Sequence, residues 1–328
     1  MAHRGFDEQM AALDALKGRD VDPSVTLELK KALASRSNFL VARAARIAED
    51  AGLAELLPDL LAAFDRFFTN PEKSDPQCWA KNALSRALPK LECRDKNVFL
   101  RGLRHHQMEP VWGGKSDSAG TLRGNCAHAL VPCDGLDNQQ LLVYLLDPLV
   151  DADKSVRVEA VRALTQLGEV AVPVLRLRAL IPGEEPEVLA ACFSALLELQ
   201  RDLAIPFVAG FLDAAEGPAA EAAFALAETR NSLALAALLK RHQDSADPWF
   251  SGVLLSAIAL TRLPEATDFL LGIIEREERE APSVIEAFGR VAPSEELRAR
   301  IAQAVQGTGS PRLQKALQEH LPTLLSQE

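Results

Sequence analysis

The feature that most constrains the fold of this chain is an internal repeat. Residues 121–130 (Thr-Leu-Arg-Gly-Asn-Cys-Ala-His-Ala-Leu) align with residues 155–164 (Ser-Val-Arg-Val-Glu-Ala-Val-Arg-Ala-Leu) at an offset of 34 positions. The closing Ala-Leu pair, Ala-Phe in one copy, recurs at spacings of 28 to 34 residues, with its alanines at Ala129, Ala163, Ala195, Ala225, Ala259, Ala287 and Ala316. With earlier copies around residues 41–48 and 87–88, the period indicates roughly eight or nine stacked supersecondary units.

Each unit has room for two helices of about 10–14 residues and their turns. In residues 151–168 the apolar positions fall at helical spacing on one stripe: Val156, Ala160, Ala163 and Leu167. Asp153 or Ser155 is positioned to cap this helix, and Gly168 to end it. The prolines from Pro148 to Pro311 mark unit boundaries, and most are expected at helix starts. No segment alternates apolar and polar residues for long enough to predict a strand, so the predicted class is all-α.

The segment Asp151-Ala-Asp-Lys-Ser-Val-Arg-Val-Glu-Ala-Val-Arg-Ala-Leu-Thr-Gln-Leu-Gly168 resembles the short HEAT-like repeat of the phycobilisome-lyase type. Weaker copies extend from about residue 37 to the C-terminus, although the later ones lack the Val-Arg start. The resemblance implies one domain over residues 1–328, a right-handed α-α superhelix of antiparallel helix pairs. Residues 1–35 and 311–328 are expected to be its terminal caps. It also implies a concave face that acts as a protein-binding scaffold.

Composition sets limits on partners and location. The net charge is −10, and residues 165–328 carry −9 of it, which disfavours nonspecific binding to nucleic acid or an anionic membrane. The five widely spaced cysteines include no C-x-x-C and indicate reduced thiols. The longest apolar run, residues 141–146, is too short to span a bilayer, and the first residues lack an apolar signal region. We expect a cytoplasmic protein without a membrane span.

One unit is interrupted, because Ala87 and Ala129 are 42 residues apart. The insertion covers residues 105–120 and is expected to form a loop, the best site candidate in the chain. Its candidate partner-binding residues are His105, His106, Glu109, Trp112, Lys115 and Asp117. Three interpretations stay open: the loop packs Trp112 over a gap between units, it binds a ligand or partner through Trp112, or it is catalytic.

Two more specific patterns in this region are incomplete. Gly114-Lys115-Ser116 resembles the end of a phosphate-binding loop, but Glu109 stands where that loop needs its first glycine. Cys126, His128 and Cys133 do not follow a known zinc spacing. Cys126 aligns with Ala160 and is expected to be buried, whereas His128 aligns with Arg162 and is expected to be exposed. We therefore predict no metal and no cofactor.

Basic residues recur on the second helices of the N-terminal units: Arg43, Arg46, Lys81, Arg86, Arg123, Arg157 and Arg162. They predict either a stripe that follows an anion or nucleic acid, as in HEAT-like alkylpurine DNA glycosylases, or structural ion pairs. For Arg123 and Arg157 the pairing candidates are Asp117, Asp151 and Asp153. The acidic net charge and scarce aromatics favour ion pairs and make nucleic acid an unlikely partner.

Enzyme signatures are missing from the sequence. No histidine is followed by Glu, which argues against a deoxyhypusine hydroxylase, and no G-x-S-x-G or H-E-x-x-H occurs. The leading hypothesis is a non-enzymatic scaffold that binds a protein through its concave face and the 105–120 loop, with Arg123 and Arg157 contributing charge or holding the stack. The alternatives are a nucleic-acid-binding solenoid of the DNA-repair type and a phycobilin-lyase-like protein. The sequence leaves the partner and the oligomeric state open.

Overall fold

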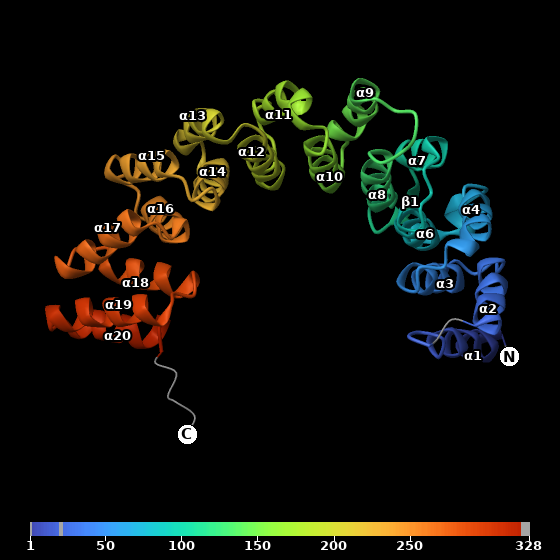
Figure 1. Ribbon diagram of the computed structural model, residues 1–328, viewed down its shortest axis with the longest axis horizontal. Helices are drawn as coiled ribbons and strands as arrows, with labels where there is room; N and C mark the ends of the chain where they lie inside the picture. Colours follow the sequence, from blue (N-terminus) through green and yellow to red (C-terminus); the bar gives the residue numbers. More distant parts are fainter. Residues whose placement is uncertain (1, 20–21, 323–328) are drawn as a thin grey trace. The chain divides into compact units, whose positions relative to one another are not determined.

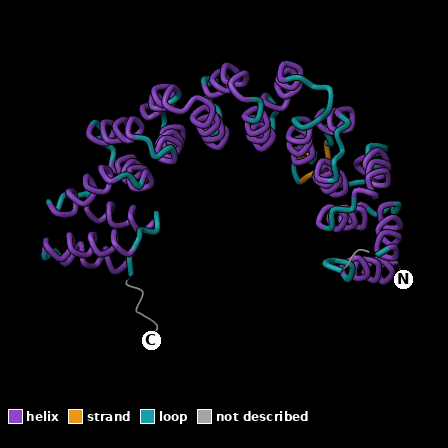
Figure 2. Tube along the Cα trace, viewed as in Figure 1, coloured by secondary structure: helices purple, strands orange, loops and turns teal. Residues whose placement is uncertain are grey.

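The protein is almost entirely helical. The structure, a computed structural model, describes residues 2–19 and 22–322, and these form twenty α-helices and only two short strands (Figures 1 and 2). The predicted all-α class is confirmed at this level. The chain divides into two compact units, unit 1 (Met1–Ala171) and unit 2 (Val172–Glu328). None of the helices in the described part of the chain is long and apolar enough to cross a membrane.

Unit 1 is built from two layers of helices. In the first layer α3, α6, α8 and α10 each pack on the next, and in the second α2, α4, α7 and α9 pack against the first. The bounds in unit 1 are α1 (Ala2–Asp14), α2 (Pro23–Leu33), α3 (Asn38–Asp50), α4 (Leu57–Arg66), α5 (Pro71–Ser74), α6 (Trp79–Lys90), α7 (Lys96–Leu103), β1 (Met108–Val111), β2 (Gly114–Asp117), α8 (Gly120–Leu130), α9 (Asn138–Leu149) and α10 (Lys154–Thr165). Single 3₁₀ turns lie at Ala54–Leu56, Pro76–Cys78 and Gly168–Ala171.

Unit 2 repeats the same two-layer packing. Its first layer is α12, α14, α16, α18 and α20, each packed on the next, and α13, α15, α17 and α19 pack along the other side. The bounds are α11 (Val172–Ala179), α12 (Pro186–Gln200), α13 (Ile205–Ala209), α14 (Glu216–Glu228), α15 (Ser232–Gln243), α16 (Pro248–Thr261), α17 (Pro264–Glu275), α18 (Ala281–Arg290), α19 (Glu295–Thr308) and α20 (Pro311–His320). Two 3₁₀ turns lie at Arg201–Leu203 and Gly210–Asp213.

Helix α10 shows how the repeat sequence produces this packing. Its predicted stripe of Val156, Ala160, Ala163 and Leu167 is buried. The carboxylate of Asp153 caps the helix by accepting a hydrogen bond from the Ser155 amide at 2.8 Å, as expected. Small residues let adjacent helices approach closely in unit 1: a Cβ at Gly102 on α7 would collide with the Cys126 sulfur on α8. Cys126 is therefore buried, as its alignment with Ala160 predicts.

Most prolines lie at helix starts, as predicted. One proline occupies the first or second position of each of α12, α13, α16, α17, α18 and α20. Pro148 is an exception, because it lies inside the last turn of α9. Of the predicted caps, residues 1, 20, 21 and 323–328 lie outside the described residues, and the rest contains α1, α2 and α20.

Candidate interaction site: the Trp112 hairpin

The insertion at residues 105–120 folds into a β-hairpin. Strands β1 and β2 pair antiparallel, with Met108 opposite Asp117 and Val111 opposite Gly114. Trp112 and Gly113 form the turn, and Gly113 has a φ of 90°, which a glycine adopts without strain. The expectation of a loop without strands was wrong at this point. Most residues of both strands are exposed, so their sequences show no alternation of apolar and polar residues. We call residues 108–117 the Trp112 hairpin.

The first strand of the hairpin is anchored to the turn that leads into α6. The Glu109 carboxylate accepts a hydrogen bond from the Gln77 amide at 2.7 Å. The side-chain amide of Gln107 donates to the Asp75 carbonyl at 2.9 Å, and its oxygen accepts from the Cys78 thiol at 3.3 Å. Gln77 and Cys78 both have positive φ, a conformation that costs free energy in non-glycine residues and persists where the surroundings fix it. Glu109 thus has a structural role in holding β1 on this turn.

The second strand is anchored through Asp117. Its carboxylate accepts hydrogen bonds from the Gln107 and Ala119 amides at 2.9 and 3.0 Å, and it lies 2.8 Å from His106 Nδ1. Burial raises the pKa of this carboxyl, but the two amides, His106 and the Arg123 guanidinium outweigh burial and hold the pKa at about 2. Asp117 is therefore ionised at neutral pH. It joins the chain that enters β1 to the chain that leaves β2, at the open end of the hairpin.

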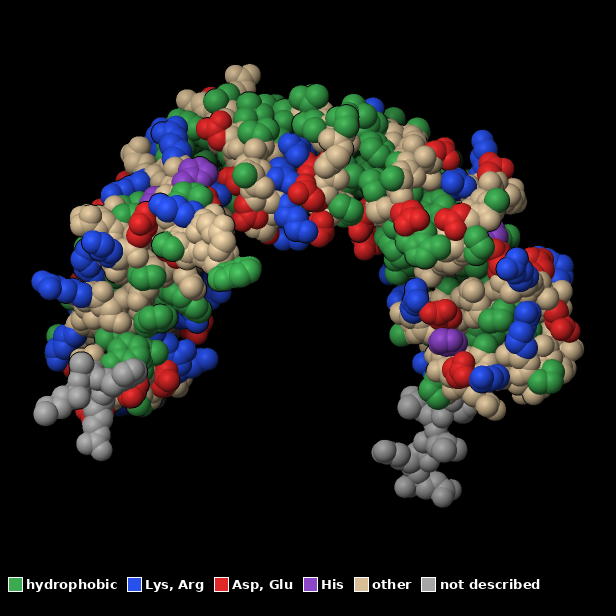
Figure 3. Space-filling view, turned by 180° about the vertical axis from the view of Figure 1, so that it is seen from behind, with side chains coloured by type: hydrophobic (Ala, Val, Ile, Leu, Met, Phe, Trp, Pro, Cys, Tyr) green, Lys and Arg blue, Asp and Glu red, His purple; other side chains and the backbone are tan. Residues whose placement is uncertain are grey.

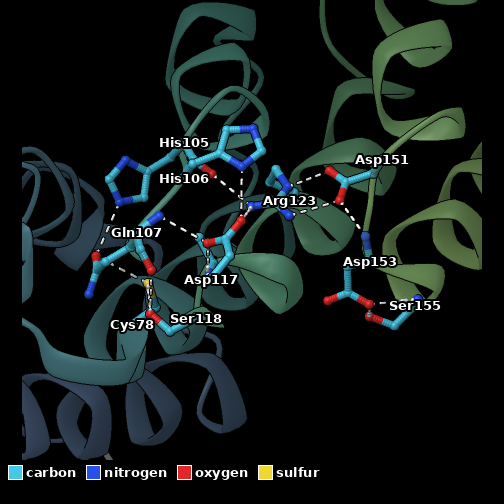
Figure 4. Close-up of polar contacts among 11 residues, drawn as sticks. Cys78, His105, His106, Gln107, Asp117, Ser118, Arg123, Asp151, Asp153 and Ser155 are labelled. Carbon is cyan, nitrogen blue, oxygen red and sulfur yellow. Dashed lines mark hydrogen bonds and ion pairs between the residues drawn. The ribbon is translucent and has the colours of Figure 1, made fainter. Parts of the chain in front are cut away.

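Arg123 connects the hairpin to the next repeat. Its side chain, buried on α8, binds the Asp151 carboxylate through Nε and Nη2 at 2.7 and 2.9 Å, and the Asp117 carboxylate through Nη1 at 2.7 Å (Figure 4). Nη1 also donates to the His105 carbonyl at 3.0 Å. The predicted pairing of Arg123 with Asp117 and Asp151 is confirmed. Arg157, also buried, donates to the Asp151 carbonyl at 2.6 Å, so both arginines act inside the stack.

Beneath the hairpin lies a fully buried ion pair. Lys81 Nζ is 3.0 Å from Asp75 Oδ2, and both side chains are inaccessible to solvent. The Asp75 carboxylate also accepts hydrogen bonds from the Asn38 side chain and from the Ala80 and Lys81 amides, and Lys81 Nζ donates to the Phe67 carbonyl. Asp75 thereby joins Asn38 of α3 to Lys81 of α6, and its own carbonyl is the group to which Gln107 binds.

The predicted basic stripe does not form a continuous surface. Lys81, Arg123 and Arg157 are buried, because each meets a carboxylate or carbonyl group inside the packed layer. Three others have carboxylate partners: Arg43 with Asp14, Arg86 with Glu49, and Arg162 with Glu159. Over the face drawn in Figure 3, basic and acidic side chains are interspersed. The interpretation as ion pairs fits these six positions, and the seventh, Arg46, is exposed.

The tip of the hairpin, in contrast, is free of intramolecular packing. Trp112 is fully exposed, and Val111, next to it on β1, is half exposed. A Cβ at Gly113 or Gly114 would meet no atom within 4 Å. The hypothesis that Trp112 fills a gap between repeats is therefore wrong. An indole exposed to water on an anchored strand pair has the form of an aromatic anchor for a partner, because the backbone that carries it is already ordered before binding.

The remaining candidate residues divide into structural and accessible ones. His105 packs edge-to-face on Phe68, and burial lowers its pKa, so its ring belongs to the core. His106 and Lys115 are exposed. Gly114-Lys115-Ser116 lies on β2 and not in a loop that opens a helix. Together with Trp112, His106 and Lys115 are the candidates that a partner can reach.

The residues of the incomplete metal pattern do not form a metal site. His128 is only about one-third exposed, because its Nε2 lies 2.6 Å from a carboxylate oxygen of Glu159 on the neighbouring helix, which corrects the expected exposed position. Cys126 is fully buried, and burial raises the pKa of its thiol far above the usual range. Within residues 2–19 and 22–322 no group of three or more His, Cys, Asp or Glu side chains is arranged to hold a metal ion.

Sequence reasoning missed an aromatic row beside the hairpin. The rings of Phe6, Phe39 and Trp79 follow one another, with centroids 6.3 Å and 5.7 Å apart. Phe39 and Trp79 occupy the first turns of α3 and α6 and are nearly half exposed. Their similar places in successive repeats were the signal available in the sequence. Trp79 follows directly on the Gln77-Cys78 turn to which the hairpin binds.

Comparison with known proteins gives no assignment. No family model matches the chain, and no curated protein matches it.

Proposed function

We propose that the protein is a HEAT-like α-solenoid that acts as a non-enzymatic scaffold, and that the Trp112 hairpin contacts a protein partner. The observation that carries the proposal is the contrast within the hairpin: its base is fixed by Asp117, Glu109 and Gln107, whereas Trp112 at its tip touches nothing in the described chain. Aromatic residues presented in this way are enriched at the centres of protein interfaces.

The solenoid part of the proposal is supported by the repeat and by the packing of each unit. The 28- to 34-residue period of the sequence corresponds to successive first-layer helices, for example α8 and α10 or α14 and α16. Each second-layer helix packs beside them, as in stacked helical repeats. The right-handed superhelix and the concave binding face remain proposals that follow from the resemblance.

The proposal is tested by quantitative affinity capture from a lysate of the source organism. The intact protein is compared with Trp112→Ala and with Trp249→Ala, a matched control that removes a half-exposed indole from unit 2. We expect one protein to be captured by the intact chain and by the control, and to be lost with Trp112→Ala. Equal capture by all three chains would contradict a role for the hairpin. Thermal unfolding of each variant checks that it folds.

The two alternatives from the sequence have less support. A nucleic-acid-binding surface would need the basic stripe, and three of its seven residues are buried. The phycobilin-lyase hypothesis stays a prediction, and incubation with a bilin and an acceptor apoprotein tests it by the appearance of a coloured adduct. Neither alternative uses the exposed Trp112.

A further inference from the structure

The two edges of the Trp112 hairpin differ in their capacity to pair with another strand. The Ser118 amide donates to the Gln107 carbonyl at 2.9 Å, so residues 107 and 118 form a hydrogen-bonded pair. Pairs alternate along an antiparallel ladder. With the observed register, the pairs 109–116 and 111–114 are then hydrogen-bonded, and Met108, Pro110, Lys115 and Asp117 direct their backbone groups away from the partner strand.

The outer edge of β1 is a poor template for a further strand. Pro110 lies at its centre and has no N–H to donate. Proline on an edge strand is one of the ways in which proteins prevent strand addition. The side chain of Glu109 is in addition committed to the Gln77 amide on the neighbouring turn.

The outer edge of β2 is open. Gly114, Lys115 and Ser116 are exposed, and no proline interrupts them. In the described chain the sheet has only these two strands, so no third strand covers this edge. The N–H and C=O of Lys115 point outward in the centre of β2, and the fully exposed Trp112 lies in the adjoining turn.

The side chain of Lys115 adds a charge preference to this edge. Lys115 lies opposite Pro110, on the same face of the hairpin as Met108, and is exposed. No carboxylate of residues 2–19 or 22–322 lies within 4.0 Å of its ammonium group, whereas the exposed Arg86 and Arg162 of unit 1 each have such a partner. Opposite charges across two strands stabilise their pairing, and like charges destabilise it.

We infer that an extended segment of a protein partner adds to the free edge of β2 as a third strand, with an acidic side chain opposite Lys115 and an apolar one beside Trp112. The inference rests on the proposed function and specifies the chemistry of the partner. A second copy of this hairpin is a worse occupant, because pairing of two β2 edges places Lys115 opposite either the other Lys115, a like charge, or Asp117, whose carboxylate already binds two amides, His106 and Arg123. Main-chain hydrogen bonds would give affinity, and Lys115 and Trp112 would give specificity.

The test uses synthetic peptides and the intact, isotope-labelled protein. The probe is the N-acetylated, C-amidated heptapeptide Thr-Val-Thr-Glu-Thr-Val-Thr, titrated into the millimolar range, where weak strand addition is detectable. We expect amide shifts at residues 114–117 and slowed amide exchange at Lys115 and Asp117. The same peptide with Lys in place of Glu should bind about three- to tenfold more weakly.

Two controls make the outcome decisive. In the bound peptide, the N–H groups of alternate residues point toward β2, and N-methylation of these residues should abolish binding. N-methylation of the other residues should leave binding unchanged. This control changes only the peptide and leaves the protein as it is. Lys115→Pro removes the outward N–H opposite the naturally occurring Pro110 and should abolish binding, whereas Lys115→Gln should retain it and lose the preference for Glu.

Absence of shifts at β2, or binding that is indifferent to the N-methylation set, would overturn the inference. If the peptides fail while capture of a partner still depends on Trp112, strand addition is wrong and the proposed function stands. If the peptides bind β2 and Trp112→Ala leaves partner capture unchanged, the proposed function is wrong at the hairpin tip.

Discussion

Units 1 and 2 share a two-layer helical packing but differ in what they bury. Unit 1 buries the charged side chains of Glu49, Asp75, Lys81, Arg123 and Arg157. Among residues 172–322 of unit 2 the buried charged side chain is Glu184, which pairs with Arg178, and the other buried polar side chains are hydroxyls. The first-layer helices of unit 2 pack instead through stripes rich in Ala, Leu and Ile.

This difference coincides with the insertion. Four of the five buried charges of unit 1, Asp75, Lys81, Arg123 and Arg157, belong to the contacts that hold the Trp112 hairpin, whereas Glu49 pairs with Arg86 and Lys90. The Asp75 carbonyl accepts from the Gln107 side chain, the Asp117 carboxylate from the Gln107 amide, and the Asp151 carboxylate from Arg123. Apolar packing alone can stabilise a repeat, but it does not fix one orientation of a small strand pair. A buried ion pair is costly to form and tolerates few geometries, and the carbonyl of Asp75 also binds Gln107, so we expect the Lys81–Asp75 pair to restrict the position of the hairpin. The predictions below test this contrast between the two units.

The largest effect is expected from Lys81→Met. The variant keeps the volume of the side chain but leaves the Asp75 carboxylate buried without a counter-charge, which should lower the free energy of unfolding by about 3–5 kcal/mol. Hydrogen exchange followed by mass spectrometry should show faster exchange in residues 38–103. The matched control in unit 2 is Lys240→Met, at an exposed position of α15. If unit 2 loosens as much as unit 1, the contrast between the units is wrong.

Arg123→Ala should have the next largest effect. It leaves Asp117 and Asp151 without their shared cation, and we expect a loss of about 2–4 kcal/mol in the free energy of unfolding. The amides of the Trp112 hairpin should exchange faster, since Asp117 then lacks its link to α8. Arg162→Ala, which removes an exposed arginine paired with Glu159, should cost less than about 1 kcal/mol. Equal losses of stability from Arg123→Ala and Arg162→Ala would show that the ion pairs of Arg123 contribute no more than an exposed pair.

The pH dependence of the free energy of unfolding tests whether the ionised Asp117 carboxylate stabilises the fold. Its pKa is about 2 in the folded protein and near 3.9 in an unfolded chain. Its ionised form therefore stabilises the fold above about pH 4, and this contribution is lost as the pH falls from 4 to 2. Asp117→Asn should make the loss of stability over this range smaller, by on the order of 1 kcal/mol after solvent screening. Urea unfolding at several pH values measures it, with Asp268→Asn in unit 2 as the control. An unchanged slope would contradict the assignment.

The smallest effect on stability is expected from Trp112→Ala. Because the indole is fully exposed, its removal should change the free energy of unfolding by less than about 0.5 kcal/mol. Phe64→Ala, at a buried position of the same unit, should cost about 3–5 kcal/mol. Thermal unfolding of the two variants compares them directly. A large loss with Trp112→Ala would mean that the indole packs on the protein in solution.

The sequence was sufficient for the parts of the fold that repeat. The apolar stripe of α10 followed from helical spacing, and its cap was narrowed to Asp153 or Ser155, of which Asp153 caps the helix. For Arg123 the resemblance to HEAT-like repeats gave three candidate partners, and two of them, Asp117 and Asp151, bind it. The candidate site was proposed from the break in the period between Ala87 and Ala129.

What the sequence could not give were features set by tertiary contacts. The hairpin was missed because two four-residue strands form only against each other and the Gln77-Cys78 turn. For Lys81 the sequence favoured an ion pair over a surface stripe, but nothing local reveals that its partner is Asp75 or that both side chains are fully buried. The exposure of Trp112 depends on where the hairpin lies on the fold, so it could not be predicted from the sequence.

Site-specific photo-crosslinking tests the central claim most directly, namely that the tip of the Trp112 hairpin contacts a protein partner. A photoreactive p-benzoylphenylalanine replaces Trp112 in one chain and Trp249 in another, and both are irradiated in cells of the source organism. The account predicts that one protein is crosslinked at position 112 and is absent at position 249, with the crosslinked segment extended and acidic. The same adducts from both positions, or none at position 112 while the protein is abundant and folded, would contradict it.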